Sequence, residues 1–567
     1  MVAAPRLPMT ADEYSKWRSM LWSQRGPNVA TPTYDGLLPC YRQALTRSER
    51  LARGGELAEP AEPAGGTIAS APPPAAATVA APMRVNTSLT PCDSPARRKL
   101  VVETLLAGVA AGAEEPFYVV DLQVATERLA LWRALLPDIE PHYAAKCNGD
   151  PALLLTLAHG GCGFDCASKA EIEEVLALGV PASRLLYANP IKQPSHLRFA
   201  AKVGVNLTVF DGEAELRKIA ELHPSSDLLL RVAVDDSQAQ CVLSNKYGAL
   251  PSDTDRLLEV AAELGLRVAG VSFHVGSGSS SGDAFRDAVA RAAAIFQQSA
   301  ARGCPMSILD VGGGFPGVDG PDVSFAAMAT SLREAISHHF PKEWGVRYIA
   351  EPGRFFAANT HTLATSVIGK KVLVAPSGAS VATAGTSQSA ATAAVGAPAH
   401  KDACPAVDIA DGGGADAAAT EVQSRVNYYI NDGLYGSFNC VLYDHASPEC
   451  FVLPTKEAPK LPADPSAPVC NVWGPTCDGI DCVLADTRLP ELPVGAWLYF
   501  PSMGAYTCCA GSNFNGMSLP DLVYLQAKGE ARPQSPTTAG AQMVAQMRAE
   551  GISPSPWSAS SGAADKL

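Results

Sequence analysis

The sequence lacks any apolar run long enough to cross a membrane, so we do not expect an integral membrane protein. It also lacks an excess of positive charge: the formal net charge is −13 at pH 7, which argues against binding to nucleic acid. The 15 cysteines show no metal-ligand spacing, and the sequence has no secretory hydrophobic segment. We therefore interpret the cysteines as reduced thiols of an intracellular protein, and we expect no metal site.

Short apolar runs alternate with amphipathic segments through the middle of the chain. The apolar runs predict eight strands, at 142–146, 163–167, 185–188, 207–210, 228–234, 268–273, 307–311 and 347–350. The amphipathic segments predict helices, among them 169–178, 213–222, 253–264 and 283–302. Eight strands alternating with helices are typical of a (β/α)8 barrel, in which catalytic groups lie at the C-terminal ends of the strands.

Polar residues follow the predicted strands at that end. They are Lys146, Asp165, Ser168, Asn189, Arg231, His274, Ser277, Gly312–Gly314, Glu351 and Arg354. Lys146 ends an apolar run, where desolvation would lower the pKa of its ammonium and let it hold an aldehyde as a Schiff base. The ordinary alternative is a lysine that extends from a strand end into water. For Arg231 we expect a carboxylate partner in the barrel mouth, with Asp165 as the candidate.

Three consecutive glycines, Gly312–Gly314, would let backbone N–H groups approach an anion closely, which favours a phosphate site. Such turns also occur for packing alone. Ser277 and Arg354 could complete the same cradle. At a strand end, Glu351 could keep the nitrogen of a pyridine cofactor protonated, and His274 could lie against its ring. The ordinary alternatives are a surface acid and a hydrogen-bonded core histidine.

Longer motifs surround these residues. They include Tyr143–Asn148, Gly163–Lys169, Ser272–Gly278, Asp310–Gly317, Ala350–Arg354, Tyr429–Gly433, Trp473–Gly479 and Gly504–Thr507. In this order they resemble eukaryotic ornithine decarboxylase, over about residues 100–373 and 425–525. The resemblance implies a pyridoxal 5′-phosphate enzyme with an alanine-racemase-like barrel and a C-terminal β-domain. It also implies a head-to-tail homodimer with two shared active sites.

The same resemblance implies roles for individual residues. The cofactor-binding set would be Lys146, Asp165, Arg231, His274, Ser277, Gly312, Gly313, Gly314, Glu351, Gly353, Arg354 and Tyr506. Lys146 would hold the cofactor covalently, and His274 would stack on its ring. The third catalytic residue would be Cys477, which would reprotonate the α-carbon after carbon dioxide leaves. An inert thiol is the ordinary alternative for this cysteine.

The implied reaction is decarboxylation of L-ornithine to putrescine, the first step of polyamine biosynthesis. Asp444, together with Asp478 from the partner subunit, would hold the distal ammonium of ornithine, because a cationic tail needs carboxylate acceptors. Tyr443 and Phe514 would complete the substrate-binding set. Lys246 and Asp481 would form an ion pair across the dimer interface.

Two alternatives stay open. One is a decarboxylase of the same fold that acts on lysine, arginine or diaminopimelate. The paired carboxylates Asp444 and Asp478 argue against diaminopimelate, whereas one extra methylene in lysine is discriminated by only about 1–3 kcal/mol. The other is an inactive relative that sequesters antizyme, but such proteins lose cofactor or thiol residues that this chain retains. An antizyme contact would fall near residues 193–223, through Lys202, Lys218 and His223.

The chain is longer than one domain needs. We predict a disordered Ala/Pro-rich extension (1–95), a joining segment (96–121), the barrel (122–360), a β-domain (361–527) with a flexible insertion (374–424), and a disordered tail (528–567). We expect a cytoplasmic protein. A plastid transit peptide in the extension is the alternative, although Asp12, Glu13, Asp35 and Glu49 depart from the acid-poor pattern of such peptides.

Overall fold

The computed structural model describes residues 95–373 and 425–525, apart from 238, 242, 280–281, 321–323, 457 and 459–466. The predictions for the N-terminal extension, the insertion and the tail fall outside these residues. Within the described ranges, no helix has the length and apolar character needed to span a bilayer.

Eight parallel strands close into a barrel in the order β10-β11-β2-β3-β4-β5-β6-β8. They are β2 (Ile139–Ala144), β3 (Gly163–Cys166), β4 (Leu185–Tyr187), β5 (Leu207–Phe210), β6 (Asp227–Arg231), β8 (Arg267–Ser272), β10 (Ile308–Asp310) and β11 (Arg347–Ala350). This barrel confirms the predicted fold class. The boundaries of β2 differ from the prediction: the strand ends at Ala144, and Lys146 lies in the following 3-10 turn, η2 (Ala145–Cys147).

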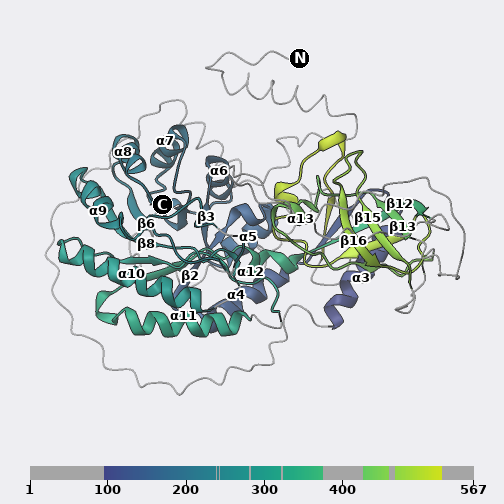
Figure 1. Cartoon of the computed structure of the whole chain (residues 1–567), viewed down its shortest axis with the longest axis horizontal. Coiled ribbons are helices and arrows are strands. Elements are labelled where there is room, and N and C mark those ends of the chain that lie inside the picture. The colour runs from purple at the N-terminus through teal and green to yellow at the C-terminus, as the bar shows by residue number, and fades with distance from the viewer. Residues whose placement is uncertain are drawn as a thin grey trace, which may run out of the picture.

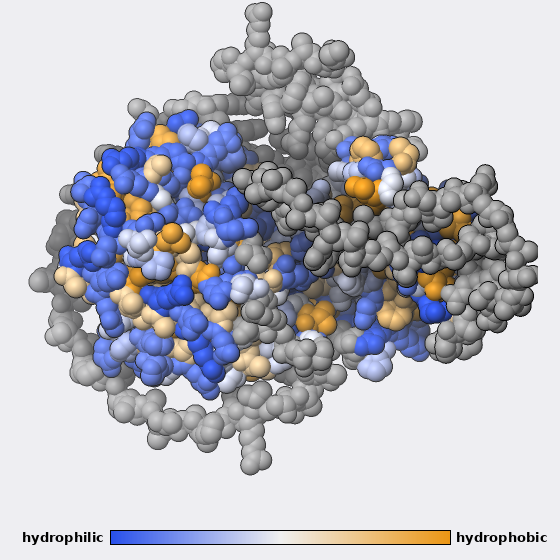
Figure 2. All heavy atoms as spheres, in the orientation of Figure 1, coloured by the Kyte–Doolittle hydropathy of each residue, from blue (hydrophilic) through white to orange (hydrophobic). Residues whose placement is uncertain are grey.

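Helices surround the barrel on its outer side, as Figure 1 shows. They are α4 (Gln123–Leu135), α5 (Pro151–His159), α6 (Lys169–Ala177), α7 (Pro194–Val203), α8 (Glu213–Leu222), α9 (Thr254–Glu263), α10 (Asp283–Ala301), α11 (Phe325–His339) and α12 (Arg354–Ala357). Local sequence sets their ends. The Ser168 hydroxyl caps α6 by accepting from the Glu171 N–H at 3.3 Å, and Gly204 ends α7 with a left-handed φ of 76°. The outward faces of the barrel helices are mainly hydrophilic in the view of Figure 2.

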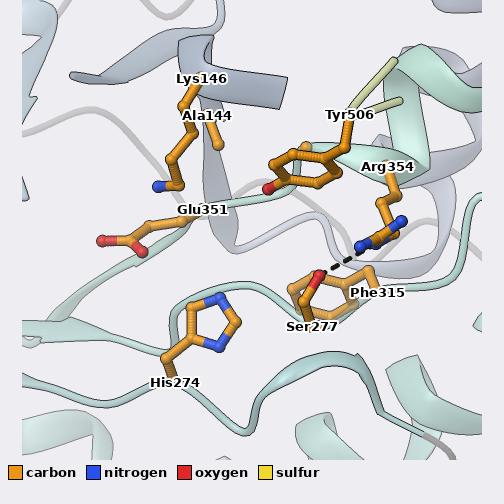
Figure 3. A pocket seen from close by; sticks show the side chains of 10 residues that line it. Ala144, Lys146, His274, Ser277, Phe315, Glu351, Arg354 and Tyr506 are labelled. Carbon is orange, nitrogen blue, oxygen red and sulfur yellow. Dashed lines mark hydrogen bonds between the residues drawn. The ribbon is translucent and has the colours of Figure 1, made fainter. Parts of the chain in front are cut away.

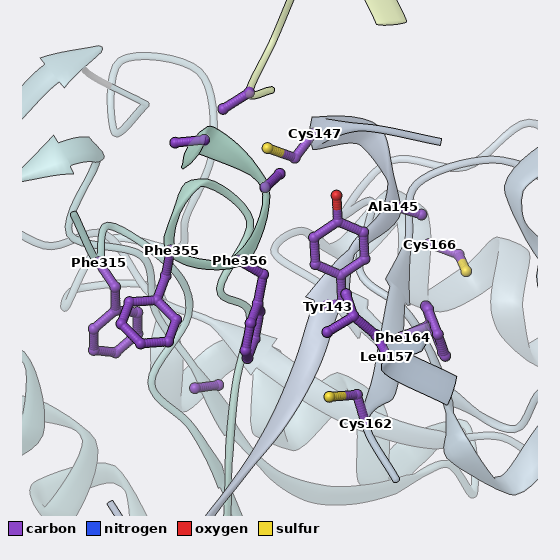
Figure 4. Packing of buried hydrophobic residues seen from close by; sticks show 14 of the residues in the cluster. Tyr143, Ala145, Cys147, Leu157, Cys162, Phe164, Cys166, Phe315, Phe355 and Phe356 are labelled. Atoms are coloured by element: carbon purple, nitrogen blue, oxygen red, sulfur yellow. The ribbon is translucent and has the colours of Figure 1, made fainter. Parts of the chain in front are cut away.

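A cluster of aromatic rings anchors the loops at the barrel mouth. Trp132 of α4 is fully buried and packs against Phe315, Phe325, Phe355 and Phe356, with ring centroids 4.9–6.1 Å apart. Phe315 directly follows the glycine turn, and Phe355 and Phe356 directly follow Arg354; Figure 4 shows their rings beside one another. Burial of these rings therefore fixes the two loops that carry the predicted phosphate-binding residues.

A second, eight-stranded sheet lies beside the barrel (Figure 1), in the order β14-β17-β12-β13-β15-β16, with β1 between β12 and β18. Its strands are β1 (Phe117–Val120), β12 (His361–Leu373), β13 (Arg425–Ile430), β14 (Phe451–Val452), β15 (Val469–Trp473), β16 (Cys482–Arg488), β17 (Trp497–Phe500) and β18 (Asp521–Tyr524). Helix α3 (Pro95–Ala110) packs on it through Leu105, and α13 (Asn439–Tyr443) follows β13. We call this sheet with α3 and α13 the sheet domain.

A two-stranded ribbon that the sequence patterns did not predict crosses the barrel mouth. It pairs β7 (Ala239–Cys241) with β9 (Ser277–Ser279), and Cys241 lies opposite Ser277. The strands are too short to show a period in the sequence. The ribbon places Cys241 next to one of the residues predicted to bind phosphate.

The insertion leaves and re-enters the sheet domain at one point, because Leu373 and Arg425 are paired neighbours on β12 and β13. We therefore expect that replacing residues 374–424 by a short turn preserves folding and activity. Each halving of a loop lowers the entropic cost of closing it by roughly 0.6 kcal/mol. The shortened protein should therefore unfold thermally at the same temperature as the full chain or slightly above it. A control deletion that also removes residues 370–373 and 425–428 cuts paired strands and should destabilise the protein. Equal damage from both deletions would show that the insertion is structural.

Candidate active site

A pocket opens at the C-terminal mouth of the barrel (Figure 3). It is lined by Ala144, Lys146, His274, Ser277, Gly314, Phe315, Glu351, Gly353, Arg354 and Tyr506. Except for Tyr506, which the sheet domain supplies, these residues lie at or just after the ends of barrel strands. The structure thus brings most of the predicted cofactor-binding set to one place.

Lys146 is ion-paired with Asp165, whose carboxylate is fully buried, at a distance of 2.5 Å. Burial by itself would lower the pKa of Lys146, but the attraction of Asp165 and Glu351 outweighs it, so the pKa is raised. The predicted depression of this pKa is therefore wrong for this arrangement. Asp165 was also the candidate partner of Arg231, but it pairs with Lys146 instead, and the Arg231 guanidinium lies over the ring of Tyr247, 5.3 Å from its centroid.

Glu351 stands beside a second buried carboxyl group, Asp310, which the sequence patterns did not single out. Burial, and then repulsion by Asp310 and Asp165, raises the pKa of Glu351 well above its usual range. Burial also raises the pKa of Asp310, whose Oδ1 accepts from the Gly312 N–H at 2.9 Å while its Oδ2 has no partner. Two adjacent buried carboxyl groups of this kind retain a proton and suit a cationic ring nitrogen as their partner.

His274 is held as a neutral ring. Burial, with Arg231 and Lys146 nearby, lowers the pKa of its imidazole. Its Nδ1 accepts a hydrogen bond from the Gly276 N–H at 3.0 Å, which leaves the ring proton on Nε2. A Cβ atom on Gly313 would lie 2.7 Å from that Nε2, so this glycine provides the space in which the imidazole lies.

Gly314 of the glycine turn and Arg354 line the part of the pocket where the sequence predicts an anion cradle. Gly312 and Gly314 have φ values of 66° and 101°, and a Cβ on Gly312 would lie 2.0 Å from the Phe273 carbonyl oxygen. The Arg354 Nε donates to the Ser277 Oγ at 2.9 Å. The guanidinium of Arg354 also lies 4.6 Å from the ring centroid of Tyr506.

Asp444 contacts Arg354 directly. Both terminal nitrogens of Arg354 donate to the Asp444 carboxylate, which is buried. Asp444 therefore borders the anion cradle, although it was predicted as a ligand for the substrate ammonium. Its neighbour Tyr443 is 71% exposed and does not line the pocket.

Three predicted catalytic or substrate-binding residues lie on the surface of the sheet domain and are not among the pocket-lining residues. They are Cys477, Asp478 and Phe514. The Tyr435 hydroxyl donates to the Asp478 Oδ2 at 2.5 Å, and the Tyr435 ring stacks on Phe514 at 4.2 Å. The Asn515 amide donates to the Cys477 Sγ at 3.3 Å. Tyr435 and Asn515 were missed in the sequence, because nothing in the local pattern shows that they support a thiol and a carboxylate.

Lys246 and Asp481 are apart within the described chain. The Lys246 ammonium lies over the Tyr247 ring, and Asp481 is buried, where it accepts from the Leu434 N–H at 2.7 Å and the Thr476 hydroxyl at 2.6 Å. Their pairing across an interface stays a prediction.

Comparison with known proteins identifies the family and the fold. The family described as pyridoxal-dependent decarboxylase, pyridoxal binding domain, matches residues 122–358. Ornithine decarboxylase of Mus musculus is 40% identical over 73% of this chain and 81% of its own length. The chain belongs to the pyridoxal-dependent decarboxylase family. The chloroplastic ornithine decarboxylase of Nicotiana glutinosa is 42% identical over 72% of this chain and 84% of its own length.

Solved structures of pyridoxal-dependent decarboxylases agree. The arginine decarboxylase of Paramecium bursaria Chlorella virus is 33% identical, with a TM-score of 0.62, over 75% of this chain and 99% of its own. The lysine/ornithine decarboxylase of Vibrio vulnificus complexed with putrescine is 27% identical, with a TM-score of 0.59, over 75% and 98%. The barrel and the accompanying sheet domain are thus shared with decarboxylases of several basic amino acids.

Pyridoxal 5′-phosphate, the cofactor of this family, fits the residues present. The amine of Lys146 would hold its aldehyde, and the buried carboxyl pair of Asp310 and Glu351 would face its ring nitrogen. The predicted anion cradle would hold its phosphate. The Asp310 Oδ2, which has no hydrogen-bond partner, supports the match independently.

Gly312→Ala tests the anion cradle. A Cβ in the left-handed region costs roughly 1–3 kcal/mol, and the contact with the Phe273 carbonyl adds to it, so both stability and cofactor affinity should fall. Denaturant unfolding and a fluorescence titration with pyridoxal phosphate measure the two effects. The matched control is Gly320→Ala, where nothing lies within 4 Å of the added Cβ. Equal behaviour of the two variants would contradict the assigned role of Gly312.

Proposed function

We propose that this protein decarboxylates L-ornithine to putrescine and carbon dioxide, the first step of polyamine biosynthesis. The observation that carries the proposal is the pocket in which Lys146, Glu351 and the Arg354 cradle face one another with the Asp444 carboxylate at its edge. Curated ornithine decarboxylases that are 40–43% identical over about three quarters of the chain support the choice of substrate.

Within the pocket the chain supplies binding, orientation and proton transfer. The bound cofactor supplies a protonated pyridine ring that delocalises the electron pair left when carbon dioxide departs. Lys146 must lose a proton before its Nζ can act as a nucleophile, and Asp165, 2.5 Å away with an unpartnered Oδ1, is positioned to influence that proton. Glu351, supported by Asp310, would hold the ring-nitrogen proton, and the neutral His274 would lie flat against the ring.

The far end of the substrate would be held by carboxylates. Asp444 does not line the pocket itself but is ion-paired with Arg354, which does. Asp478 and Cys477 are on the surface, next to exposed apolar side chains such as Ile480 (55% exposed) and Phe514 (43% exposed). We therefore propose a head-to-tail homodimer in which the partner subunit's Cys477 protonates the α-carbon and the partner subunit's Asp478 accepts the distal ammonium, with Tyr443 and Phe514 completing the substrate site. The Lys246–Asp481 pair across the interface belongs to this proposal.

Other predictions stay within the same proposal. Cytoplasmic location is our proposal, with a plastid as the alternative, in keeping with the relative from Nicotiana glutinosa whose name specifies the chloroplast. We retain the division into a barrel over 122–360 and a β-domain over 361–527. Antizyme would bind at residues 193–223, which contain α7, β5 and α8.

Two of the residues expected to contact antizyme are unsuitable. His223 is buried, with Nε2 3.0 Å from the Val205 carbonyl oxygen, and Lys218 is bonded to the buried carboxylate of Glu215 at 2.5 Å. A contact on α7 and α8 would therefore rely on other side chains of these helices.

The first experiment measures carbon dioxide released from carboxyl-labelled ornithine, lysine and arginine, with and without added pyridoxal phosphate. We expect cofactor-dependent release with ornithine preferred over lysine by roughly tenfold or more, the discrimination that one methylene allows. Lys146→Ala serves as the blank and should also lose the visible absorbance of the bound cofactor. A preference for lysine or arginine would assign the chain to the alternative substrates, and silence on all three would support an inactive homologue.

Mixing two inactive variants tests the shared site. Lys146→Ala removes a residue of the pocket, and Cys477→Ala removes the thiol that we assign to the other subunit. If each site uses both chains, random pairing should restore about a quarter of the wild-type sites. Each variant alone is the control. No recovery in a mixture whose subunits demonstrably exchange would contradict the shared site.

A further inference from the structure

Asp444 binds the same guanidinium that would bind the cofactor phosphate. Both terminal nitrogens of Arg354 donate to its carboxylate, and the Arg354 Nε donates to Ser277. A guanidinium has five N–H donors. Three of them are used in these contacts, so two remain for a further anion. Asp444 and a bound phosphate are therefore neighbours on one charged group.

The carboxylate of Asp444 is held from a second side by the ribbon at the barrel mouth. The Cys241 thiol lies 3.4 Å from its Oδ1, and the Gln240 side-chain amide donates to its backbone carbonyl. Cys241 lies opposite Ser277 across the ribbon. Four residues thus form a closed group of contacts at the pocket edge: Asp444, Cys241, Ser277 and Arg354. The side chain of Asp444 is only 9% exposed.

We propose that Asp444 is shared between Arg354 and the distal ammonium of the substrate, so that diamine binding and phosphate binding strengthen each other. The inference rests on the proposed function for the identity of the ammonium. While Asp444 is paired only with Arg354, its charge offsets the charge that Arg354 presents to a phosphate. When an ammonium group shares the carboxylate, that offset weakens and Arg354 attracts the phosphate more strongly.

Two consequences follow from this sharing. Because coupling between two binding sites is reciprocal, phosphate must raise diamine affinity by the same factor by which diamine raises phosphate affinity. The enzyme would also hold its cofactor most tightly while substrate or product occupies the site, and less tightly once the diamine has left.

The test uses the full chain stripped of cofactor, with inorganic phosphate as the probe of the cradle and 1,4-diaminobutane as the cation. Phosphate affinity is measured by 31P NMR titration with and without saturating diamine. Diamine affinity is measured by calorimetry with and without saturating phosphate. We expect each ligand to tighten the other by about fivefold or more, within the range found for coupled sites. Equal factors confirm that both titrations report the same equilibrium. No effect of either ligand on the other in the wild-type protein would overturn the proposal without any variant being needed.

Asp444→Asn separates the shared carboxylate from simple attraction between a bound diamine and a bound phosphate. Direct attraction would persist in this variant. Under our proposal the asparagine variant binds phosphate more tightly than the wild type without diamine, and the diamine effect falls to the part that direct attraction supplies. Weaker phosphate binding, or a diamine effect as large as in the wild type, would show that Asp444 only orients Arg354 and would overturn the proposal.

Two further variants serve as matched controls. Asp444→Glu retains the charge and should retain the coupling. Asp478→Asn removes the other carboxylate assigned to the ammonium, but this residue contacts Tyr435 and not Arg354. The coupling factor of Asp478→Asn at saturating diamine should therefore equal that of the wild type. A loss of coupling in Asp478→Asn would contradict the claim that the coupling acts through Asp444.

The outcome is independent of turnover. If labelled ornithine is decarboxylated but phosphate and diamine bind without coupling, the proposed function stands and this inference fails. If the diamine does not bind at all, the assignment of the substrate fails first.

Discussion

Arg354 carries its positive charge between the barrel and the sheet domain, and each of its partners comes from a different part of the chain. Ser277 belongs to the ribbon at the barrel mouth, whereas Tyr506 and Asp444 belong to the sheet domain. Phe355 and Phe356, the next two residues, pack against Trp132 in the core. A guanidinium moved from water into such a place must be paired. The need to pair this one charge therefore constrains how the two domains meet and where the mouth of the pocket lies.

A second constraint opposes stability. Asp165, Asp310 and Glu351 place three carboxyl groups in the barrel interior, near the cations Lys146 and Arg231. Burial raises the pKa values of Asp310 and Glu351, so ionising both groups is unfavourable in the protein alone. Asp310 Oδ2 and Asp165 Oδ1 also lack hydrogen-bond partners. Unsatisfied buried groups of this kind concentrate at functional sites, where the protein retains them for a ligand at the expense of its own stability.

The sequence was sufficient to predict the barrel because strand and helix periods alternate clearly, and to predict Lys146 and Glu351 because they follow strands. It was not sufficient to predict side-chain pairing, which depends on register. Ala144 lies opposite Asp165 across β2 and β3, and this register brings Asp165 to Lys146 rather than to Arg231. Asp310 and Cys241 were missed for the same reason, since their importance comes from neighbours on other strands. Tyr435 and Asn515 depend on the fold of the sheet domain in the same way.

Cys477 is exposed and does not line the pocket, so the proposed chemistry depends on a second subunit to bring this thiol to the cofactor site. Burial raises the pKa of the Cys162 thiol to about 12, and burial likewise raises the pKa of Cys147, beside the pocket, so both thiols hold their protons tightly. Cys477 is exposed and contacts Asn515. In the proposed homodimer its surroundings are completed only when the second subunit covers it. Under this proposal an isolated subunit would retain the cofactor site without the group that finishes the reaction.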